Sequence, residues 1–423
     1  MDNPRKVAVK TLLKIERDNA YSNISLASAL KEAELSAADK ALASALVYGV
    51  LDRKLTLDYV LAQFMKSPLK KTAPFTLAVL RTALYQIMYM DKIPESAAVD
   101  EAVKLIKKSR ESRNSGFVNA VLRKILREKY ELPSGESVNA LSIKYSCSEW
   151  IIDSFIKDYG MENTEKLLSE SLKAAPLCIR VNTLKTNSND LINEFKKTGV
   201  ALNEGAIENS LCFSKGIDIA NNTLFNKGYF HVQDIASQTV TSVLNPESEC
   251  RVLDMCAAPG GKSCTLAEIM KNKGEIISCD IYDARVGLIA DNAKRLGVNI
   301  IKPTLCDATE YDSRLGEFDC VLCDVPCSGL GVIRRKPEVK YKEKQDLSEL
   351  EEIQYKILCN AVRYLKKGGK LLYSTCTLRR AENENLVIRF QKEYNNFRKV
   401  YEHTYMPHID GTDGFYCALL IKE

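Results

Sequence analysis

Two cysteines stand in short polar segments that each follow a predicted strand. Cys327 lies in residues 324–329 (DVPCSG), and Cys376 lies in residues 373–377 (YSTCT). A thiolate can attack an electrophilic carbon, but a free thiol has a pKa of about 8.5 and needs cationic or polar surroundings to ionise. Lys262 and residues 379–380 (RR) are the candidates to provide them. With only three histidines in the chain, catalysis is expected to rest on cysteine, carboxylate or lysine.

A glycine-containing loop follows the first predicted strand of the C-terminal half. Its glycines let the backbone approach a ligand closely, and the helix that follows offers N–H groups to an anion. A P-loop would need glycine at 256, and the dinucleotide motif GxGxxG is also absent. A small carboxylate fits better, such as the methionine end of S-adenosylmethionine. The predicted loop consists of Cys256, Ala257, Ala258, Pro259, Gly260, Gly261 and Lys262.

Acids follow the next strands. Asp280 ends the second predicted strand, where a carboxylate can accept hydrogen bonds from ribose hydroxyls. Asp307 follows the third strand and is a candidate acceptor for an adenine amino group. A single Asp after a strand is usually a helix cap. Their joint placement with the glycine loop instead predicts a cofactor site.

The elements that must position these residues alternate between strand and helix after residue 245. Such alternation predicts a mostly parallel sheet with helices on both faces, and ligands bind outside the carboxyl ends of such strands. Neighbouring strands lie only ~4.8 Å apart, so the two cysteines can face one substrate group. Strands are expected at 251–255, 275–280, 300–305, 318–324 and 370–374, helices at 263–271, 283–296, 349–365 and 381–393, and a final strand pair ending at 415–421.

The N-terminal part has a different character. Residues 5–130 show apolar side chains at helical spacing, with breaks that predict a bundle of several helices. Residues 1–130 carry 23 Lys and Arg against 14 Asp and Glu, which suits either a nucleic-acid-binding module or a solvated helical surface. A linker at 132–135 (LPSG) leads into a mixed region with helices at 149–159 and 162–172 and short strands at 177–181 and 229–232.

Composition limits the remaining possibilities. No apolar run approaches the ~20 residues that span a bilayer, so a cytoplasmic protein without a membrane partner is expected. Most of the 14 cysteines are expected to be reduced and buried. The spacing Cys320-x2-Cys323-x3-Cys327 resembles a metal motif, but Cys320 and Cys323 would point to opposite faces of one strand. No metal site is therefore expected.

Several of these segments resemble the bacterial small-subunit ribosomal RNA cytosine-C5 methyltransferases of the RsmB/Sun (Fmu) family. The resemblance covers essentially the whole chain. It rests on the loop 256–262, on 324–329 with 331–337 (GVIRRKP), on 374–376 (STC) and on 413–416 (DGFY). Residues 48–50, 80–86 and 116–123 are similar to a NusB-type helical domain, and residues 180–183 and 232–237 to the family's connecting domain.

The resemblance implies a multidomain enzyme that uses S-adenosylmethionine to methylate carbon 5 of a cytosine in 16S ribosomal RNA. It also implies that the enzyme acts as a monomer. It assigns Cys376 as the nucleophile that adds to carbon 6 of the base and Cys327 as the residue that helps to release the product. Asp324 would hydrogen-bond the cytosine and also contact the cofactor, and Lys262 would favour the thiolate. The implied domains are an all-α NusB-like RNA-binding bundle at 1–132, a small α+β connecting domain at 133–233 and a Rossmann-like class I methyltransferase domain at 234–423.

The sequence departs from the family's usual pattern in a few places. Residues 145–149 (YSCSE) replace a common His-Pro pair, and Val325 and Leu330 replace the usual alanine and threonine. Two other classes of function stay open. One is a non-catalytic RNA-binding adaptor, and the other is a DNA cytosine methyltransferase, in which Cys327 would be the nucleophile.

Overall fold

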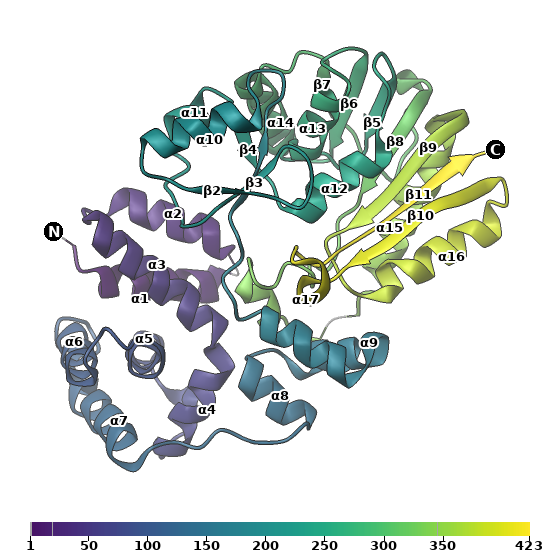
Figure 1. Ribbon diagram of the computed structural model, residues 1–423. Coiled ribbons are helices and arrows are strands. Elements are labelled where there is room, and N and C mark those ends of the chain that lie inside the picture. The colour runs from purple at the N-terminus through teal and green to yellow at the C-terminus, as the bar shows by residue number, and fades with distance from the viewer. Residues whose placement is uncertain (1, 19, 345) are drawn as a thin grey trace. The chain divides into compact units, whose positions relative to one another are not determined.

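The computed structural model describes residues 2–18, 20–344 and 346–423, and these form two compact units. The first unit comprises Met1–Lys173 with Ile333–Gln345, and the second comprises Ala174–Val332 with Asp346–Glu423. Figure 1 shows the helical elements of the first and the two sheets of the second.

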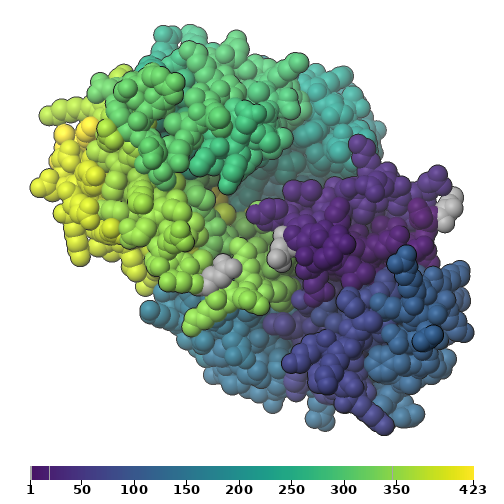
Figure 2. Space-filling model, turned by 180° about the vertical axis from the view of Figure 1, so that it is seen from behind, coloured from purple at the N-terminus to yellow at the C-terminus, as the bar shows by residue number. Residues whose placement is uncertain are grey.

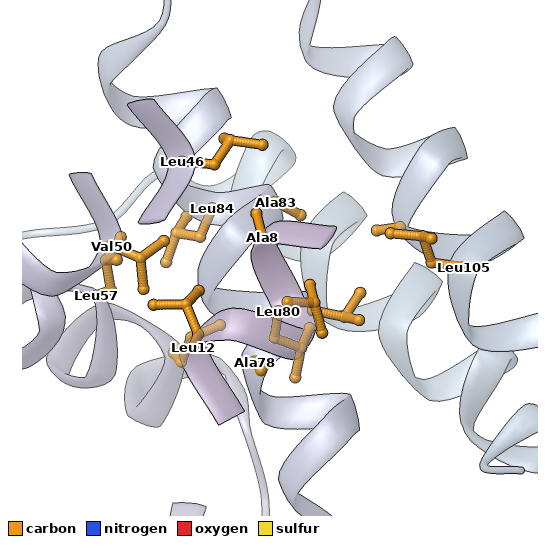
Figure 3. Close-up of a cluster of buried hydrophobic side chains, with 14 of the residues drawn as sticks. Ala8, Leu12, Leu46, Val50, Leu57, Ala78, Leu80, Ala83, Leu84 and Leu105 are labelled. Atoms are coloured by element: carbon orange, nitrogen blue, oxygen red, sulfur yellow. The ribbon is translucent and has the colours of Figure 1, made fainter. Parts of the chain in front are cut away.

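The first unit is all-helical and is organised around α5 (Pro74–Tyr89), which packs against α1, α3, α4, α6 and α7. Pro74 stands in the first turn of α5, where a missing N–H costs nothing. Leu80 and Leu84 are fully buried and lie among side chains of α1, α3 and α4 (Figure 3). The other helices are α1 (Pro4–Asp18), α2 (Ser22–Glu32), α3 (Ala37–Asp52), α4 (Lys54–Phe64), α6 (Glu95–Lys107), α7 (Ser115–Glu128), α8 (Val138–Tyr145) and α9 (Glu149–Glu170).

The break predicted between residues 159 and 162 is confirmed. Gly160 has φ +77°, a left-handed conformation that glycine adopts without steric cost, and it interrupts α9. The predicted bundle of several helices is confirmed as well.

Residues 333–344 belong to the C-terminal half of the sequence but pack into the helical unit. Lys340, whose side chain is fully buried, donates from Nζ to the carbonyl of Asp52 at 3.0 Å and to its Oδ1 at 3.4 Å. Glu338 accepts a 2.8 Å hydrogen bond from the hydroxyl of Ser22, and the Tyr341 hydroxyl donates to the carbonyl of Leu51. In Figure 2 light-green atoms of this part of the chain lie beside purple atoms of the first helices.

We expect Lys340→Met to lower the stability of the helical unit by about 3 kcal/mol, or its Tm by about 8 °C, because the largely buried Asp52 carboxylate loses its partner. Thermal unfolding followed by circular dichroism measures this. The double variant with Asp52→Asn should recover part of the loss. Lys344→Met, at an exposed position of the same segment, is the control and should leave the Tm unchanged. A Lys340→Met Tm equal to that of the control would contradict the expectation.

The second unit contains a small sheet in the order β2-β3-β1-β4 with all pairs antiparallel. Its core includes Phe195, Phe213 and Phe230, whose rings meet mostly edge-on or tilted. A disulfide joins Cys178 to Cys212 across β1 and β3, and the other twelve cysteines form no disulfide, which confirms that most are reduced; only six of these twelve are buried. The elements are β1 (Cys178–Val181), α10 (Ser188–Lys197), β2 (Leu202–Glu204), β3 (Ser210–Phe213), α11 (Thr223–Asn226) and β4 (Phe230–Val232).

Only β1 and β4 of this sheet were predicted. β2 has three residues, mostly exposed, and so carries no buried alternating pattern. The disulfide was not predicted either, because sequence spacing does not say which residues pair across strands.

The large sheet has the order β10-β11-β9-β8-β5-β6-β7, and β11 is antiparallel to both of its neighbours. The strands β7, β6, β5, β8 and β9 are mutually parallel, which confirms the predicted mostly parallel sheet. The strands are β5 (Arg251–Asp254), β6 (Glu275–Asp280), β7 (Ile301–Leu305), β8 (Phe318–Asp324), β9 (Leu365–Thr375), β10 (Phe397–Tyr405) and β11 (Phe415–Lys422).

Helices cover both faces of this sheet (Figure 1). Cys320 packs with α13 on one face and Cys323 with α15 on the other, so the predicted alternation of these cysteines along β8 is confirmed. The helices are α12 (Ile235–Leu244), α13 (Gly261–Ile269), α14 (Asp283–Leu296), α15 (Ser348–Ala361), α16 (Glu384–Glu393) and α17 (Pro407–Asp410).

Several helix ends differ from the prediction by a few residues, among them both ends of α13, which spans Gly261–Ile269 instead of 263–271. Two further differences have a clear local cause. α15 ends at Ala361 instead of near residue 365, because residues 362–364 form a 3-10 turn that leads directly into β9. α16 begins three residues later than predicted, because Arg380–Glu382 forms a 3-10 turn whose last side chain points into the protein. The second difference affects the site described next.

Candidate active site

The loop between β5 and α13 is a tight turn held against β6. The N–H of Ala257 donates to the carbonyl of Cys279 at 2.8 Å, and the N–H of Gly260 donates to the carbonyl of Ala257 at 2.7 Å. The peptide bond between Ala258 and Pro259 is cis. Gly260 has φ +96°, and a Cβ there would also stand only 3.2 Å from the backbone of α14, so glycine is required. The turn leads into the N-terminus of α13, where helix N–H groups favour an anion.

Asp254 lies fully buried beneath this loop. Its Oδ2 accepts a 2.6 Å hydrogen bond from the hydroxyl of Ser263, which in turn accepts one from Ser278 at 2.8 Å. Burial raises the pKa of Asp254 to about 7. Sequence reasoning assigned Asp254 no role, although an acid at the end of an otherwise apolar strand is a signal that could have marked it.

The two predicted cofactor acids lie at the same sheet edge, after the neighbouring parallel strands β6 and β7. Asp280 is 3 % exposed, accepts from the N–H of Tyr282 at 3.2 Å and lies 3.4 Å from the guanidinium of Arg285. Asp307 accepts from the N–H and the hydroxyl of Thr309 at 2.8 and 2.7 Å. It lines an open pocket of about 460 Å³. Both acids thus also stabilise the turns that follow their strands.

Lys262, in the first turn of α13, and Asp324, at the end of β8, form a direct ion pair. The distance between Lys262 Nζ and Asp324 Oδ2 is 2.7 Å, and the hydroxyl of Ser374 donates to Asp324 Oδ1 at 2.8 Å. Burial alone would lower the pKa of Lys262. The charge of Asp324 and the hydrogen bond that Lys262 donates to it outweigh burial, so the pKa of Lys262 is raised. The ammonium lies 5.0 Å from the centre of the Phe415 ring. Lys262 is therefore a fixed cation, and it also interacts electrostatically with Cys376.

The two cysteines meet where β8 and β9 end. These strands are parallel neighbours with Asp324 opposite Ser374, so the segments that follow them run side by side. The sulfur atoms of Cys327 and Cys376 are 3.2 Å apart. The hydrogen bond to Cys376, burial and the nearby charge of Glu382 together raise the pKa of Cys327 well above its usual value. At neutral pH Cys327 is therefore a thiol.

The cationic and anionic neighbours of the pair differ. Lys262 interacts with Cys376, whereas Glu382 interacts with Cys327. Arg379, which the sequence suggested as a cation for the thiolate, instead forms ion pairs with Glu351 and Glu382, each at 3.1 Å. Charges of opposite sign therefore act on the two sulfurs.

All of the predicted site residues lie along the carboxyl edge of β7, β6, β5, β8 and β9. Sequence reasoning assigned no role to a set of buried polar residues behind the cysteines. Two of them stand within the cysteine segments, and the others come from elements with no motif of their own. The set consists of Ser328, Gln354, Thr377, Glu382 and Asn383.

Within the described residues no group of three or more His, Cys, Asp or Glu side chains is arranged to hold a metal ion. In the same part of the chain no helix is both long and apolar enough to cross a membrane.

The order of the large sheet, its single reversed strand β11 and the glycine turn after β5 define a Rossmann-like methyltransferase domain. Comparisons with known proteins agree. The family model described as 16S rRNA methyltransferase RsmB/F matches residues 241–421, the NusB family model matches 2–127, and an RsmF/B-like ferredoxin-like domain model matches 147–220.

Curated relatives match over the full length. The probable ribosomal RNA small subunit methyltransferase B of Bacillus subtilis is 38% identical, with 99% of this chain and 98% of the relative covered. That of Synechocystis is 32% identical with 100% of each covered. The chain therefore belongs to the ribosomal RNA small subunit methyltransferase B family.

Solved structures resemble the protein as well. PH0851 covers 100% of this chain and 99% of its own, with a TM-score of 0.86 and 28% identity. A methyltransferase homolog from Pyrococcus horikoshii covers 69% of this chain and 100% of its own, with a TM-score of 0.61 and 26% identity.

Proposed function

We propose that this protein transfers a methyl group from S-adenosylmethionine to carbon 5 of a cytosine in 16S ribosomal RNA, through a covalent bond between Cys376 and carbon 6 of the base. The observation that carries the proposal is the pair of cysteine sulfurs 3.2 Å apart beside the glycine turn. The curated relatives, which are named as small-subunit ribosomal RNA methyltransferases, support the RNA substrate. On the basis of the family resemblance, we also propose that the protein is cytoplasmic and acts as a monomer.

The residues of the carboxyl edge suit S-adenosylmethionine. The N-terminus of α13 would face its carboxylate, Asp280 its ribose and Asp307 its adenine amino group. The left-handed turn at Gly260 directs the chain into the N-terminus of α13. When bound, the cofactor supplies an electrophilic methyl group.

The protein's own residues prepare the base. Cys376 Sγ adds to carbon 6, which turns carbon 5 into an enamine-like nucleophile able to accept the methyl group. Asp324, held by Lys262 and Ser374, can accept a hydrogen bond from the cytosine amino group and so orients the base for attack. Lys262 stabilises the thiolate of Cys376 before attack.

Release of the product needs the loss of the proton from carbon 5 and the cleavage of the bond between Cys376 Sγ and carbon 6. Water takes the proton from carbon 5, the electrons of that bond form the double bond between carbons 5 and 6, and the Cys376 sulfur leaves as a thiolate. The Cys327 thiol, 3.2 Å from that sulfur, can assist by donating a hydrogen bond to it. Because Cys327 keeps its proton at neutral pH, it does not compete with Cys376 for the base.

Incubation of the purified protein with 16S ribosomal RNA and S-adenosylmethionine is expected to produce 5-methylcytidine, which mass spectrometry of the digested RNA identifies. A DNA copy of the same sequence serves as control and should gain no methyl group. Methylation of an exocyclic nitrogen or a ribose hydroxyl would overturn the proposed position on the base. Methylation of the DNA copy alone would point to the DNA enzyme instead.

A further inference from the structure

Glu382 anchors the backbone on both sides of Cys327. Its side chain is fully buried, and it accepts from the hydroxyl of Ser328 at 2.6 Å and from the N–H of the same residue at 2.9 Å. Gln354 donates through Nε2 to Glu382 Oε2 and to the carbonyl of Pro326, both at 2.9 Å. Ser328, after the cysteine, is thus bound directly to Glu382, and Pro326, before it, is bound to Gln354, which itself donates to Glu382.

Asn383, the next residue, does the same for Cys376. It is fully buried, its Oδ1 accepts from the hydroxyl of Thr375 at 2.6 Å, and its Nδ2 donates to the carbonyl of Thr377 at 3.0 Å. The hydroxyls of Ser328 and Thr377 lie 2.7 Å apart and join the two cysteine segments directly.

A buried carboxylate is costly unless it is paired and hydrogen-bonded, and here Arg379 and the donors above meet that requirement. Such a satisfied network fixes the positions of its members more firmly than isolated contacts do. The two sulfurs have no disulfide between them, so this network is the visible reason why they are held at 3.2 Å.

We propose that Glu382 and Asn383 together form a positioning clamp for the site cysteines, with Glu382 fixing the Cys327 segment and Asn383 fixing the Cys376 segment. The expected effect of the clamp on methyl transfer rests on the proposed function, but the hydrogen bonds of the clamp are present without substrate. Neither residue touches the reacting atoms, so both act through the cysteines.

The clamp also has an electrostatic consequence. The titratable groups around the Cys327 thiol are Cys376, Glu382 and Tyr373. Arg379 pairs with Glu382 and with Glu351, while Lys262, paired with Asp324, acts on the Cys376 side. The negative charge of Glu382 helps to keep Cys327 protonated, so its removal should make the Cys327 thiol ionise at lower pH.

The test combines thiol titration with methyl transfer in the full-length protein. Alkylation by iodoacetamide at a series of pH values, mapped at Cys327 by mass spectrometry, needs neither RNA nor cofactor. Glu382→Gln keeps the size of the side chain and is expected to shift the alkylation midpoint of Cys327 to lower pH. Glu384→Gln, whose carboxylate bonds Thr404 away from the cysteines, is the matched control and should match wild type.

Asn383→Ala leaves the charge of Glu382 in place and is expected to lower methyl transfer about 10-fold or more without moving the Cys327 midpoint. Asn385→Ala, the same substitution at an exposed position two residues away, should have no effect. If Glu382→Gln does not fold, Ser328→Ala removes only the hydroxyl that joins the two segments and is expected to slow transfer as well.

An unchanged Cys327 midpoint in folded Glu382→Gln, or a transfer rate of Asn383→Ala or Ser328→Ala within twofold of wild type, overturns the clamp. Failure of wild type to form 5-methylcytidine would instead count against the proposed function, and the alkylation experiment would still decide on the clamp.

Discussion

Cys376→Ala is expected to reduce methyl transfer by roughly a thousandfold or more and to form no covalent complex with RNA, because no other group can add to carbon 6. Cys327→Ala should retain the nucleophile but lose the residue that assists its elimination. A covalent protein–RNA complex should then accumulate in the presence of S-adenosylmethionine. Denaturing gels with labelled 16S ribosomal RNA detect it.

The asymmetry of charges around the sulfur pair is the physical reason for these opposite outcomes. Lys262 acts on Cys376, while the hydrogen bond to Cys376, burial and the charge of Glu382 together raise the pKa of Cys327. Cys250→Ala is a suitable control, since Cys250 precedes β5 at the opposite edge of the sheet and should behave as wild type. A complex formed by Cys376→Ala but not by Cys327→Ala would reverse the two roles and restore the mechanism of the DNA enzymes.

Gly331→Ala is expected to destabilise the catalytic unit by about 2–3 kcal/mol and to slow methyl transfer at least about 100-fold. A Cβ at this position would lie 2.0 Å from the carbonyl oxygen of Gly414 and 2.8 Å from that of Cys376. These atoms are backbone, so they cannot yield without moving the cysteine segment. The N–H of Gly331 also donates to the carbonyl of Cys376 at 3.0 Å, and its own carbonyl accepts from Gly414 at 2.8 Å.

Gly287→Ala is the matched control, and it is expected to change the stability in the opposite direction. Gly287 is exposed on α14, and a Cβ there would meet no atom within 4 Å. Replacement should stabilise the helix by about 0.5–1 kcal/mol and leave activity unchanged. Chemical denaturation and the methyl-transfer rate together test the pair. Equal effects of the two substitutions would show that the close approach at Gly331 does not matter.

Much of the large sheet could be predicted because its elements are long and each carries a consistent local pattern. The helix Asp283–Leu296 and the strands Glu275–Asp280 and Phe318–Asp324 lie where the sequence predicts them. The small antiparallel sheet was harder, since strands of three or four residues carry too little pattern to be recognised and their pairing is non-local.

The candidate cofactor loop and the two cysteine segments were visible in the sequence for a related reason. Each consists of adjacent residues that follow a recognisable strand, and parallel strands end at one edge. Gln354, Glu382 and Asn383 had no such context. They reach the cysteine segments from a helix and a turn, and only the folded chain brings their side chains there.

The chemical groups at the sheet edge could be predicted from local pattern, because two thiols, a lysine and carboxylates each follow a recognisable strand. That the sulfurs lie 3.2 Å apart, that Lys262 pairs with Asp324, and that residues 333–344 pack into the helical unit became visible in the folded protein. Distances between side chains from different elements depend on packing and on buried hydrogen bonds across the chain. No local pattern encodes these.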